Sequence, residues 1–382
     1  MKIAILKENK NEQRVSLVPA DVKTLVSSKH EVVVTKGAGV NAGFNDDDYL
    51  TAGAKVLGTN RETVSNSNII LKISHPAKDE LKWISPNQIL ISIFNLANNP
   101  KILFQLLKYK TTALAIEAIE EDNVFSVMIP NEQIKGRFGA LLGAYNLAKM
   151  FDGGLGKTFT SLQHNSSKAQ FTVLNASYAG LEAAKTILGL GADLTILEND
   201  EHLAKQIQND HDLHTLAKLN DANFEVKKAD FTDLNNIVVN TDVLINTNSV
   251  PGSLTAKRIT RTMVSKMKTG SVIVDLAIDQ GVTCDSESAP SKIKKPSYIV
   301  EGVKHFALEN IPTLFPNSIS VSISHILTEK FLKHLKGENV LNVIKDIDVL
   351  FRAIVTYDGN ITNKLVADTL HLDFKNIKTL IK

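Results

Sequence analysis

The fold of this chain is decided by the stretch Ala169-Gln-Phe-Thr-Val-Leu-Asn-Ala-Ser-Tyr-Ala-Gly180. The chain continues as Leu181-Glu-Ala-Ala-Lys-Thr-Ile-Leu-Gly-Leu-Gly191 and then as Ala192-Asp-Leu-Thr-Ile-Leu-Glu198. A short apolar strand enters a turn, a helical segment follows, and a second apolar strand ends on an acidic residue. This is the order of a dinucleotide-binding βαβ unit. The sequence therefore predicts that a doubly wound α/β domain begins here.

The turn lacks two of the three glycines that this motif normally carries, because the three positions hold Asn175, Ser177 and Gly180. The first glycine makes a tight turn, the second lets the backbone approach the pyrophosphate, and the third packs the helix on the strand. Asparagine tolerates positive φ better than most residues, so Asn175 is compatible with the turn. Ser177 places a hydroxyl and a Cβ near the phosphate, where it either donates a hydrogen bond or blocks binding. Two interpretations stay open: a cofactor-binding domain, or a domain that keeps the fold without the cofactor.

Glu198 lies 18 residues beyond Gly180, at the end of the second strand. A carboxylate in this position accepts hydrogen bonds from both ribose hydroxyls and repels a 2′-phosphate. It therefore favours NAD over NADP as the cofactor. On spacing alone, a second interpretation has equal weight: Glu198 is a charged residue that ends a strand and binds nothing.

Length and composition limit the classes of protein. The chain has 382 residues, enough for two domains with separate cores. With 43 basic and 41 acidic residues, its net charge of +2 selects neither nucleic acid nor a membrane as partner. Cys284 is the only cysteine, which excludes an intrachain disulfide and indicates a reducing compartment. No apolar stretch approaches the roughly 20 residues that span a bilayer. We expect a cytoplasmic protein with a small-molecule substrate.

In the first third of the chain, runs of strand length alternate with amphipathic segments, which predicts a parallel sheet with helices on both faces. The predicted strands are Lys2–Leu6, Glu31–Thr35, Ile69–Ile73, Ile89–Phe94 and Thr111–Ile116, and the predicted helices are Pro19–Ser28, Lys101–Tyr109 and a long one over Gln133–Met150.

A second series of alternating strands and helices starts at Ala169. Its predicted strands are Phe171–Leu174, Leu194–Leu197, Phe224–Lys227, Val243–Asn246 and Ser271–Leu276. Further along, the composition predicts a surface loop over Thr283–Pro296, helices over Ile319–Leu335 and Val340–Thr356, and a polar, basic tail over Leu370–Lys382. The fold class is therefore α/β, with two Rossmann-like, doubly wound domains built on parallel sheets.

Three charged residues stand out as candidates for a site. The guanidinium of Arg14 is suited to hold a carboxylate in bidentate fashion, although a solvated surface arginine is the commoner interpretation. Lys72 lies in the strand Leu71-Lys-Ile-Ser-His-Pro76, where burying an unpaired ammonium would cost several kcal/mol. Asp279 follows a buried strand, at the edge where α/β sheets place their ligands, but without context it is a turn or cap residue.

Several short motifs, in this order and spacing, resemble the alanine dehydrogenase family, whose fold the nucleotide-binding part of proton-translocating transhydrogenase shares. The resemblance covers nearly the whole chain. Its anchors are Lys7-Glu-Asn-Lys-Asn-Glu-Gln-Arg-Val15, Gly37-Ala-Gly39, Gly43-Phe-Asn-Asp-Asp-Asp-Tyr49, Gly136-Arg137, Gly143-Ala-Tyr145, Val250-Pro-Gly252, Val274-Asp-Leu-Ala-Ile-Asp-Gln-Gly281 and Glu309-Asn-Ile-Pro312.

The resemblance implies a discontinuous first domain, which the chain leaves and rejoins. We expect a substrate domain of residues 1–130 plus 311–382 and a dinucleotide-binding Rossmann domain of residues 131–310. It also implies NAD as cofactor, substrate bound between the domains, and a homo-oligomer, since relatives form dimers or hexamers. No metal is part of this expectation.

The resemblance also assigns roles to single residues. Arg14 matches the arginine that holds the substrate carboxylate, and Asp279 matches the aspartate beside nicotinamide and substrate. The expected cofactor residues are Ser177, Gly180, Glu198, Val250 and Asn310.

Two matches to the catalytic residues of the family fail. The catalytic lysine of the family falls on Ser74, while the preceding lysine survives as Lys72, and the catalytic histidine falls on Asn95. Asn95 donates a hydrogen bond but cannot exchange a proton near neutral pH. Ser74 lacks the positive charge that polarises a carbonyl. We therefore expect low or altered alanine dehydrogenase activity, with Ser74 and Asn95 still contacting substrate.

Three hypotheses follow from these matches and losses. The first is an active NAD-dependent oxidoreductase for an amino acid, or for an amino acid condensed with a keto acid, in which Lys72, His75 or Asp279 supplies the proton chemistry. The second is a catalytically lapsed relative that binds a metabolite or a protein. The third, a transhydrogenase subunit, fits poorly because the sequence shows no membrane segment and no mobile loop for a partner domain.

Overall fold

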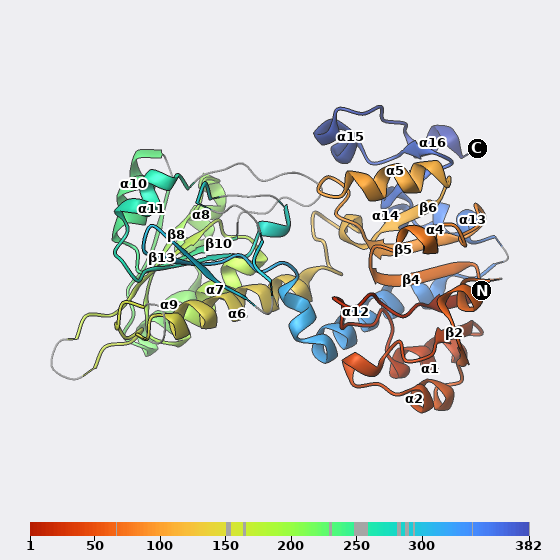
Figure 1. Cartoon of the computed structure of the whole chain (residues 1–382), viewed down its shortest axis with the longest axis horizontal. Coiled ribbons are helices and arrows are strands. Elements are labelled where there is room, and N and C mark those ends of the chain that lie inside the picture. Colours follow the sequence, from red (N-terminus) through yellow and green to blue (C-terminus); the bar gives the residue numbers. More distant parts are fainter. Residues whose placement is uncertain are drawn as a thin grey trace. The chain divides into compact units, whose positions relative to one another are not determined.

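The computed structural model describes residues 1–65, 67–149, 154–162, 166–228, 231–247, 259–280, 284–286, 290–292, 295–337 and 339–381. The chain forms two compact units. Unit 1 contains Met1–Pro130 and Pro312–Lys382, and unit 2 contains most of the chain between them. In Figure 1 the red-to-orange start and the blue end of the chain accordingly lie in one body, while the middle forms the other.

Unit 1 is built on an eight-stranded sheet in the order β15-β14-β6-β5-β4-β1-β2-β3. Its strands are β1 (Lys2–Ile5), β2 (Glu31–Thr35), β3 (Lys55–Leu57), β4 (Ile69–Ser74), β5 (Ile89–Ile93), β6 (Thr112–Ala115), β14 (Ile354–Tyr357) and β15 (Asn360–Ile361). The six strands from the first third pair in parallel, and β14 and β15 pair antiparallel. The near-continuous apolar runs of β4 and β5 suit parallel strands that are buried on both faces.

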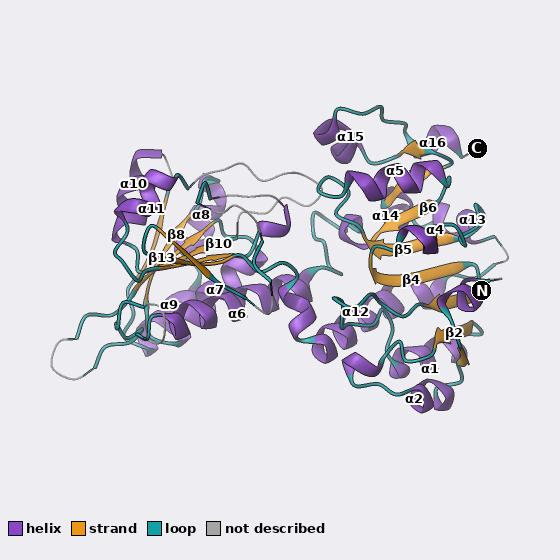
Figure 2. Cartoon of the chain, in the orientation of Figure 1, coloured by secondary structure: helices purple, strands orange, loops and turns teal. Residues whose placement is uncertain are grey.

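Helices cover this sheet, as the purple ribbons around the orange strands show in Figure 2. They are α1 (Pro19–Ser27), α2 (Asp46–Thr51), α3 (Asn60–Val64), α4 (Lys78–Leu81), α5 (Pro100–Lys108), α12 (Pro316–Lys330), α13 (Val340–Lys345), α14 (Asp348–Arg352), α15 (Lys364–Leu370) and α16 (Ile377–Leu380). Proline occupies the first position of α1, α5 and α12, where its missing N–H costs nothing. The core includes Leu6, Phe94 and Leu103.

The C-terminal segment is bonded to the N-terminal segment of unit 1 through side chains. Ser320 and Ser324 on α12 accept hydrogen bonds from the backbone N–H groups of Val15 and Val18, at 2.9 and 3.0 Å. Thr313 accepts one from Gln13 N at 2.8 Å. The loop after β1 is therefore held in place by residues some 300 positions further along the chain.

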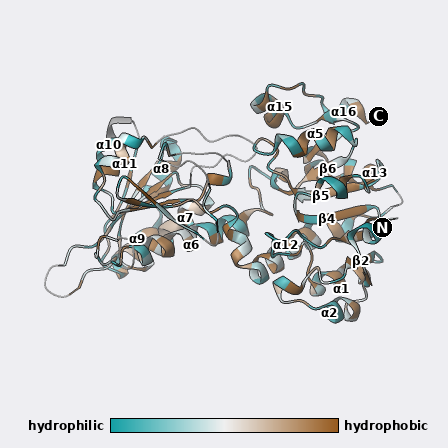
Figure 3. Cartoon of the chain, in the orientation of Figure 1, coloured by the Kyte–Doolittle hydropathy of each residue, from teal (hydrophilic) through white to brown (hydrophobic). Residues whose placement is uncertain are grey.

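Unit 2 contains a seven-stranded sheet in the order β12-β13-β11-β10-β7-β8-β9. Its strands are β7 (Gln170–Leu174), β8 (Asp193–Leu197), β9 (Phe224–Lys227), β10 (Val243–Asn246), β11 (Val272–Asp275), β12 (Tyr298–Val300) and β13 (Val303–Phe306). All pairings are parallel except that of β12 with β13. Figure 3 shows brown, apolar residues along the strands.

The helices that accompany this sheet are α6 (Ile129–Asn146), α7 (Tyr178–Gly189), α8 (Glu201–Gln208), α9 (His211–Leu219), α10 (Phe231–Asn240) and α11 (Arg261–Lys266). Two glycines let α6 pack closely. A Cβ on Gly136 would lie 2.1 Å from the carbonyl oxygen of Ala179, and one on Gly143 would lie 2.5 Å from a methyl group of Val243.

The predicted fold class is confirmed: both units are α/β, with mostly parallel sheets. The antiparallel strands β12, β14 and β15 were not predicted. The single helix expected over Val340–Thr356 is wrong, because α13 and α14 are short and Ile354–Tyr357 is a strand that pairs with β6. The long helix starts at Ile129 rather than Gln133, with Pro130 in its first turn.

The segment expected as a surface loop and the tail expected to be polar and basic are both partly buried. Within Thr283–Pro296, Cys284 and Ser286 are buried, and Cys284 joins the core of unit 2. In the tail Leu370–Lys382, Ile377 on α16 is buried. Among the described residues, no helix is long and apolar enough to cross a membrane.

Candidate functional site

The turn between β7 and α7 has the shape that a nucleotide-binding turn requires. Asn175 adopts a φ of 71°, in the left-handed region that the sequence allowed for asparagine. A Cβ on Gly180 would lie 2.3 Å from the carbonyl oxygen of Asn175 and 2.9 Å from Oγ1 of Thr247. Gly180 therefore has no space for a side chain, which confirms that the helix packs tightly on the strand at this point.

Ser177 is the N-cap of α7, and its hydroxyl accepts a hydrogen bond from Gly180 N at 3.2 Å. The cap satisfies one of the N–H groups that a helix N-terminus leaves without a helical partner. The φ of Ser177 is −59°, an ordinary value, so the backbone at this position does not need glycine. The hydroxyl hydrogen still has donor capacity toward a ligand.

Glu198, directly after β8, is a buried carboxylate held by the backbone. Its Oε2 accepts from Ala176 N at 2.8 Å, and its Oε1 accepts from Asn199 N and Asp200 N at 2.7 and 3.0 Å. A carboxylate offers about four lone-pair positions. These bonds fix Glu198 against the nucleotide turn. They leave few lone-pair positions of its carboxylate to accept a hydrogen bond from a ribose hydroxyl.

These residues fit a dinucleotide. The first turn of a helix of this length, with its partial positive charge, suits a pyrophosphate. Ser177 would lie against the phosphates and Glu198 against the ribose. The expected cofactor residue Val250 lies outside the described residues.

A second charged group in unit 2 surrounds Asp279. Lys135, on α6, bonds to Asp279 at 3.2 Å and to Glu132 at 3.1 Å. Burial lowers the pKa of Lys135, but the two carboxylates outweigh burial and raise that pKa overall. Burial, together with the negative charge of Asp279, raises the pKa of Glu309. Asn310 follows with a φ of 55°. Asp279 is thus one carboxylate of an ionic cluster and not only a turn residue.

In unit 1, polar residues gather at the carboxyl edge of the sheet, where ligands bind in α/β folds. Arg14 is buried, and its guanidinium forms two hydrogen bonds to Glu12, from Nε at 2.7 Å and from Nη2 at 2.6 Å. Thr313 also donates to Glu12, at 3.1 Å. The commoner interpretation of Arg14 as a solvated surface residue is therefore wrong.

Lys72 is fully buried in β4, and its ammonium lies 2.7 Å from Oε2 of Glu80. Glu80 also accepts from Ala77 N at 2.8 Å and from Asn60 Nδ2 at 2.5 Å. The pairing removes the cost of an unpaired buried ammonium.

Ser74, at the end of β4, is bonded to Glu8, which follows β1. Ser74 Oγ donates to Glu8 Oε2 at 2.6 Å, and Ile73 N donates to Glu8 Oε1 at 2.5 Å. Burial raises the pKa of Glu8 to about 7, with Lys72 and the Ser74 hydrogen bond opposing that rise.

Asn95 follows β5 with a φ of 47° and is half-buried. Its backbone N–H and that of Phe94 both donate to Glu117 Oε1, at 2.8 and 2.9 Å. Burial raises the pKa of Glu117. The carboxyl ends of β1, β4, β5 and β6 thus bring Glu8, Ser74, Asn95 and Glu117 to one edge. Asp279 belongs to the other unit, and the expectation that substrate binds between the two domains stays a prediction.

The acidic partners in these pairs were not predicted from the sequence. The spacing Glu12-x-Arg14 is a usable signal, because residues two apart in extended backbone point the same way. Glu132 and Lys135 are three apart on a helix, which also places them together. For Glu80 and Glu117, no local pattern reveals the partner, since the bonds depend on strand order.

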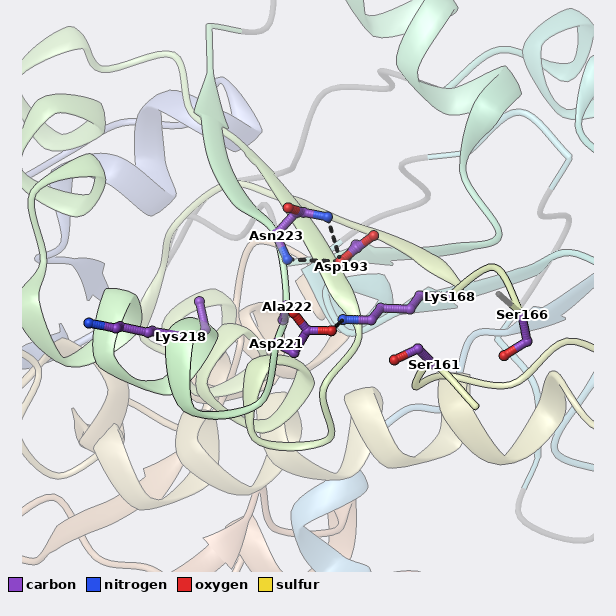
Figure 4. A pocket seen from close by; sticks show the side chains of 9 residues that line it. Ser161, Ser166, Lys168, Asp193, Lys218, Asp221, Ala222 and Asn223 are labelled. Carbon is purple, nitrogen blue, oxygen red and sulfur yellow. Dashed lines mark hydrogen bonds and ion pairs between the residues drawn. The ribbon is translucent and has the colours of Figure 1, made fainter. Parts of the chain in front are cut away.

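Figure 4 shows a polar pocket of about 430 Å³ at the opposite, amino edge of the unit 2 sheet. Lys168 points toward Asp221, at 3.2 Å, and Asn223 donates to Asp193. Its position separates it from the nucleotide turn. Across the described ranges, no group of three or more His, Cys, Asp and Glu residues is arranged to hold a metal ion.

Comparisons with known proteins match both units. The family model for the N-terminal domain of alanine dehydrogenase/PNT matches residues 4–130, and the model for the C-terminal domain matches residues 139–364. Alanine dehydrogenase of Staphylococcus saprophyticus is 32% identical over 386 residues, which cover 100% of both chains.

Solved structures agree with these matches. One named L-alanine dehydrogenase has a TM-score of 0.84 and 28% identity, covering 97% of this chain and 99% of that one. A transhydrogenase from Sinorhizobium meliloti has a TM-score of 0.73 and 24% identity, covering 95% of this chain and 99% of that one, and shows the shared fold alone. The family models and the full-length relative together show that this chain belongs to the alanine dehydrogenase/PNT family, a family of oxidoreductases.

Proposed function

We propose that this chain is an NAD(H)-dependent oxidoreductase that interconverts an amino acid and its 2-keto acid, with low or altered alanine dehydrogenase activity. One observation carries the proposal: the nucleotide turn keeps its shape without two of its glycines, with Asn175 at positive φ and Glu198 bonded to Ala176 N. A domain that had lost its cofactor would have no need to keep this arrangement. The names of the relatives support an amino acid as substrate.

In this proposal unit 2 holds the cofactor and unit 1 holds the substrate. Ser177, Gly180, Glu198, Asn310 and Val250 bind the dinucleotide, which supplies hydride exchange when bound. Asp279 stands beside the reacting atoms, and its bond to Lys135 fixes its carboxylate.

The substrate side of the site is assigned to unit 1. Arg14 holds the substrate carboxylate, and Ser74 and Asn95 contact the reacting end of the molecule. Because Lys72 is fully buried and paired with Glu80, we assign it an electrostatic part in place of direct proton transfer.

Activity with pyruvate and ammonia should be low, because Ser74 and Asn95 stand where relatives carry a charged and a proton-exchanging group. Each such loss costs a factor of about 10² to 10⁴ in rate. The experiment compares turnover of the natural chain with that of the double variant Ser74→Lys/Asn95→His. The double variant should be faster, because its lysine and histidine supply the charge and the proton exchange that Ser74 and Asn95 lack and so replace the Ser74 hydroxyl, although the two changes need not multiply. A natural turnover within the usual range of about 1 to 10³ per second would contradict this assignment.

A second candidate is a lapsed relative that binds a metabolite or a protein without chemistry. It is favoured by the Ser177 cap, which takes up a helix N–H that a phosphate would otherwise meet. The two candidates differ in nucleotide affinity, since only the enzyme needs to bind NADH. We also propose a homo-oligomer, by analogy with the family.

A further inference from the structure

Glu8 and Ser74 are bonded directly, across two neighbouring parallel strands. Glu8 follows β1 and Ser74 ends β4, and the carboxyl oxygen and hydroxyl lie 2.6 Å apart. Both residues are half-buried, in contrast to the fully enclosed Lys72. A hydroxyl both donates and accepts a hydrogen bond, so Ser74 is able to pass a proton between Glu8 and a bound molecule.

The charges around Glu8 are arranged so that its own charge is weakly compensated. The ammonium of Lys72 lies near it but is paired with another carboxylate, that of Glu80, at 2.7 Å. Glu12 adds a repulsive negative charge, and burial has the largest effect, so that the pKa of Glu8 rises to about 7. Glu8 therefore populates both protonation states near neutral pH, as an acid–base group must.

Solvent also reaches Glu8. Glu8 lines a polar pocket of about 340 Å³ together with Lys7, Thr59, Asn60 and Glu80. The exposed Lys7 and the half-buried Asn60 border it, so water has a route to the Glu8 carboxyl. A proton given up by Glu8 is thus replaceable from solvent.

We infer that Glu8 and Ser74 form the proton-exchange pair of this chain, a catalytic assignment that rests on the proposed function. In the amination direction, the carbinolamine formed from ammonia and the keto acid must lose its hydroxyl as water. The Ser74 Oγ–H bond breaks as its proton bonds to that oxygen, and the Glu8 proton moves to Ser74 Oγ. The carbon–oxygen bond breaks with its electron pair on the departing water. The products are an iminium ion, water and the Glu8 carboxylate, so atoms and charge balance.

Three variants of the full-length chain test this pair: Glu8→Gln, Ser74→Ala and the control Glu31→Gln. Glu31 is an exposed carboxylate at the amino end of β2, away from the carboxyl edge. The measurement is kcat/KM for NADH oxidation with keto acid at a fixed concentration of free ammonia, from pH 5.5 to 9. The rate of the natural chain should fall as the pH rises through about 7. Glu8→Gln should remove this dependence and lower the rate by a factor of about 10² or more, Ser74→Ala should also be slow, and Glu31→Gln should match the natural chain.

A natural rate and pH profile in Glu8→Gln would overturn the pair and leave the proposed function intact. Absence of turnover in the natural chain would contradict the proposed function, and infrared titration of the carboxyl bands would then decide the pair independently. A band that titrates near pH 7, disappears in Glu8→Gln and moves to higher pH in Ser74→Ala supports it, because the Ser74 hydrogen bond lowers the pKa of Glu8. A Glu8 band that titrates in the ordinary carboxyl range, or that Ser74→Ala leaves in place, overturns it.

Discussion

At the scale of single residues, the carboxyl edge of the unit 1 sheet is organised by buried ion pairs. Arg14 and Lys72 each bind a carboxylate, Glu12 and Glu80, at 2.6 and 2.7 Å. Both cations were predicted from the sequence as site candidates, Lys72 because a lysine in an apolar strand is unusual and Arg14 because its guanidinium is suited to hold a carboxylate. Glu80 was not predicted as the partner of Lys72, because the turn and helix that bring it back to Lys72 are set by tertiary structure.

Removing one member of the Lys72–Glu80 pair should destabilise unit 1 strongly. Lys72→Met leaves the buried Glu80 carboxylate without its cation, which costs about 3 to 5 kcal/mol for pairs of this kind. The double variant Lys72→Met/Glu80→Leu should recover part of that loss. Urea denaturation measures the free energy of unfolding of both variants. The exposed pair of Lys82 and Asp79 is the control, and Lys82→Met should change stability little. An unchanged free energy of unfolding in Lys72→Met would contradict the paired arrangement.

Glu8 gives unit 1 a pH-dependent stability of defined sign. The pKa of Glu8 rises from 4.5 in the unfolded chain to about 7 in the folded protein. Between these values the folded protein retains the proton and the unfolded chain releases it, so the contribution of Glu8 to stability falls as the pH rises and is constant above about 7. Glu8→Gln should therefore gain stability relative to the natural chain between pH 4.5 and 7, by at most about 3 kcal/mol. Equal pH slopes for the two proteins in urea denaturation would contradict the raised pKa.

At the scale of elements, the strand–turn–helix at Asn175–Gly180 was predictable because each of its requirements is local. The apolar strand, an asparagine that accepts positive φ, and the glycine at the closest approach are all visible in the sequence. The role of Ser177 was not visible, because a serine before a helix is either a cap or a ligand. The prediction of a helix over Val340–Thr356 was wrong for the opposite reason. The apolar spacing of the segment suits a helix, but the end of the segment pairs with β6 as a strand.

Two glycines at opposite ends of α7 form a matched pair of variants. Gly180→Ala places a Cβ 2.3 Å from the Asn175 carbonyl oxygen, so the turn must shift, stability should fall and NADH binding should be lost. Gly189→Ala meets nothing within 4 Å and should stabilise α7 by about 0.5 to 1 kcal/mol. Thermal unfolding and NADH titration report both effects. Equal behaviour of the two variants would show that Gly180 is not the point of closest approach.

At the scale of the whole molecule, the chain completes its first unit only at its end. The bonds from Ser320 and Ser324 to the segment after β1, and the pairing of β14 with β6, join residues more than 200 positions apart. No periodicity in the sequence reveals such contacts, so the expected return of the chain depended on the family resemblance. The polar residues at the carboxyl edge of the unit 1 sheet also depend on the returning segment, since Thr313 donates a hydrogen bond to Glu12 beside Arg14.

The proposal that unit 2 binds NAD depends on a turn that has lost two glycines, and direct titration of nucleotide tests it. Fluorescence titration of the natural chain with NADH and with NADPH should give a sub-millimolar dissociation constant for NADH, and weaker binding of NADPH because Glu198 repels the 2′-phosphate. Glu198→Gln should reduce the difference between the dissociation constants for NADH and NADPH. No saturable binding of NADH at several millimolar would contradict the account and favour the lapsed relative.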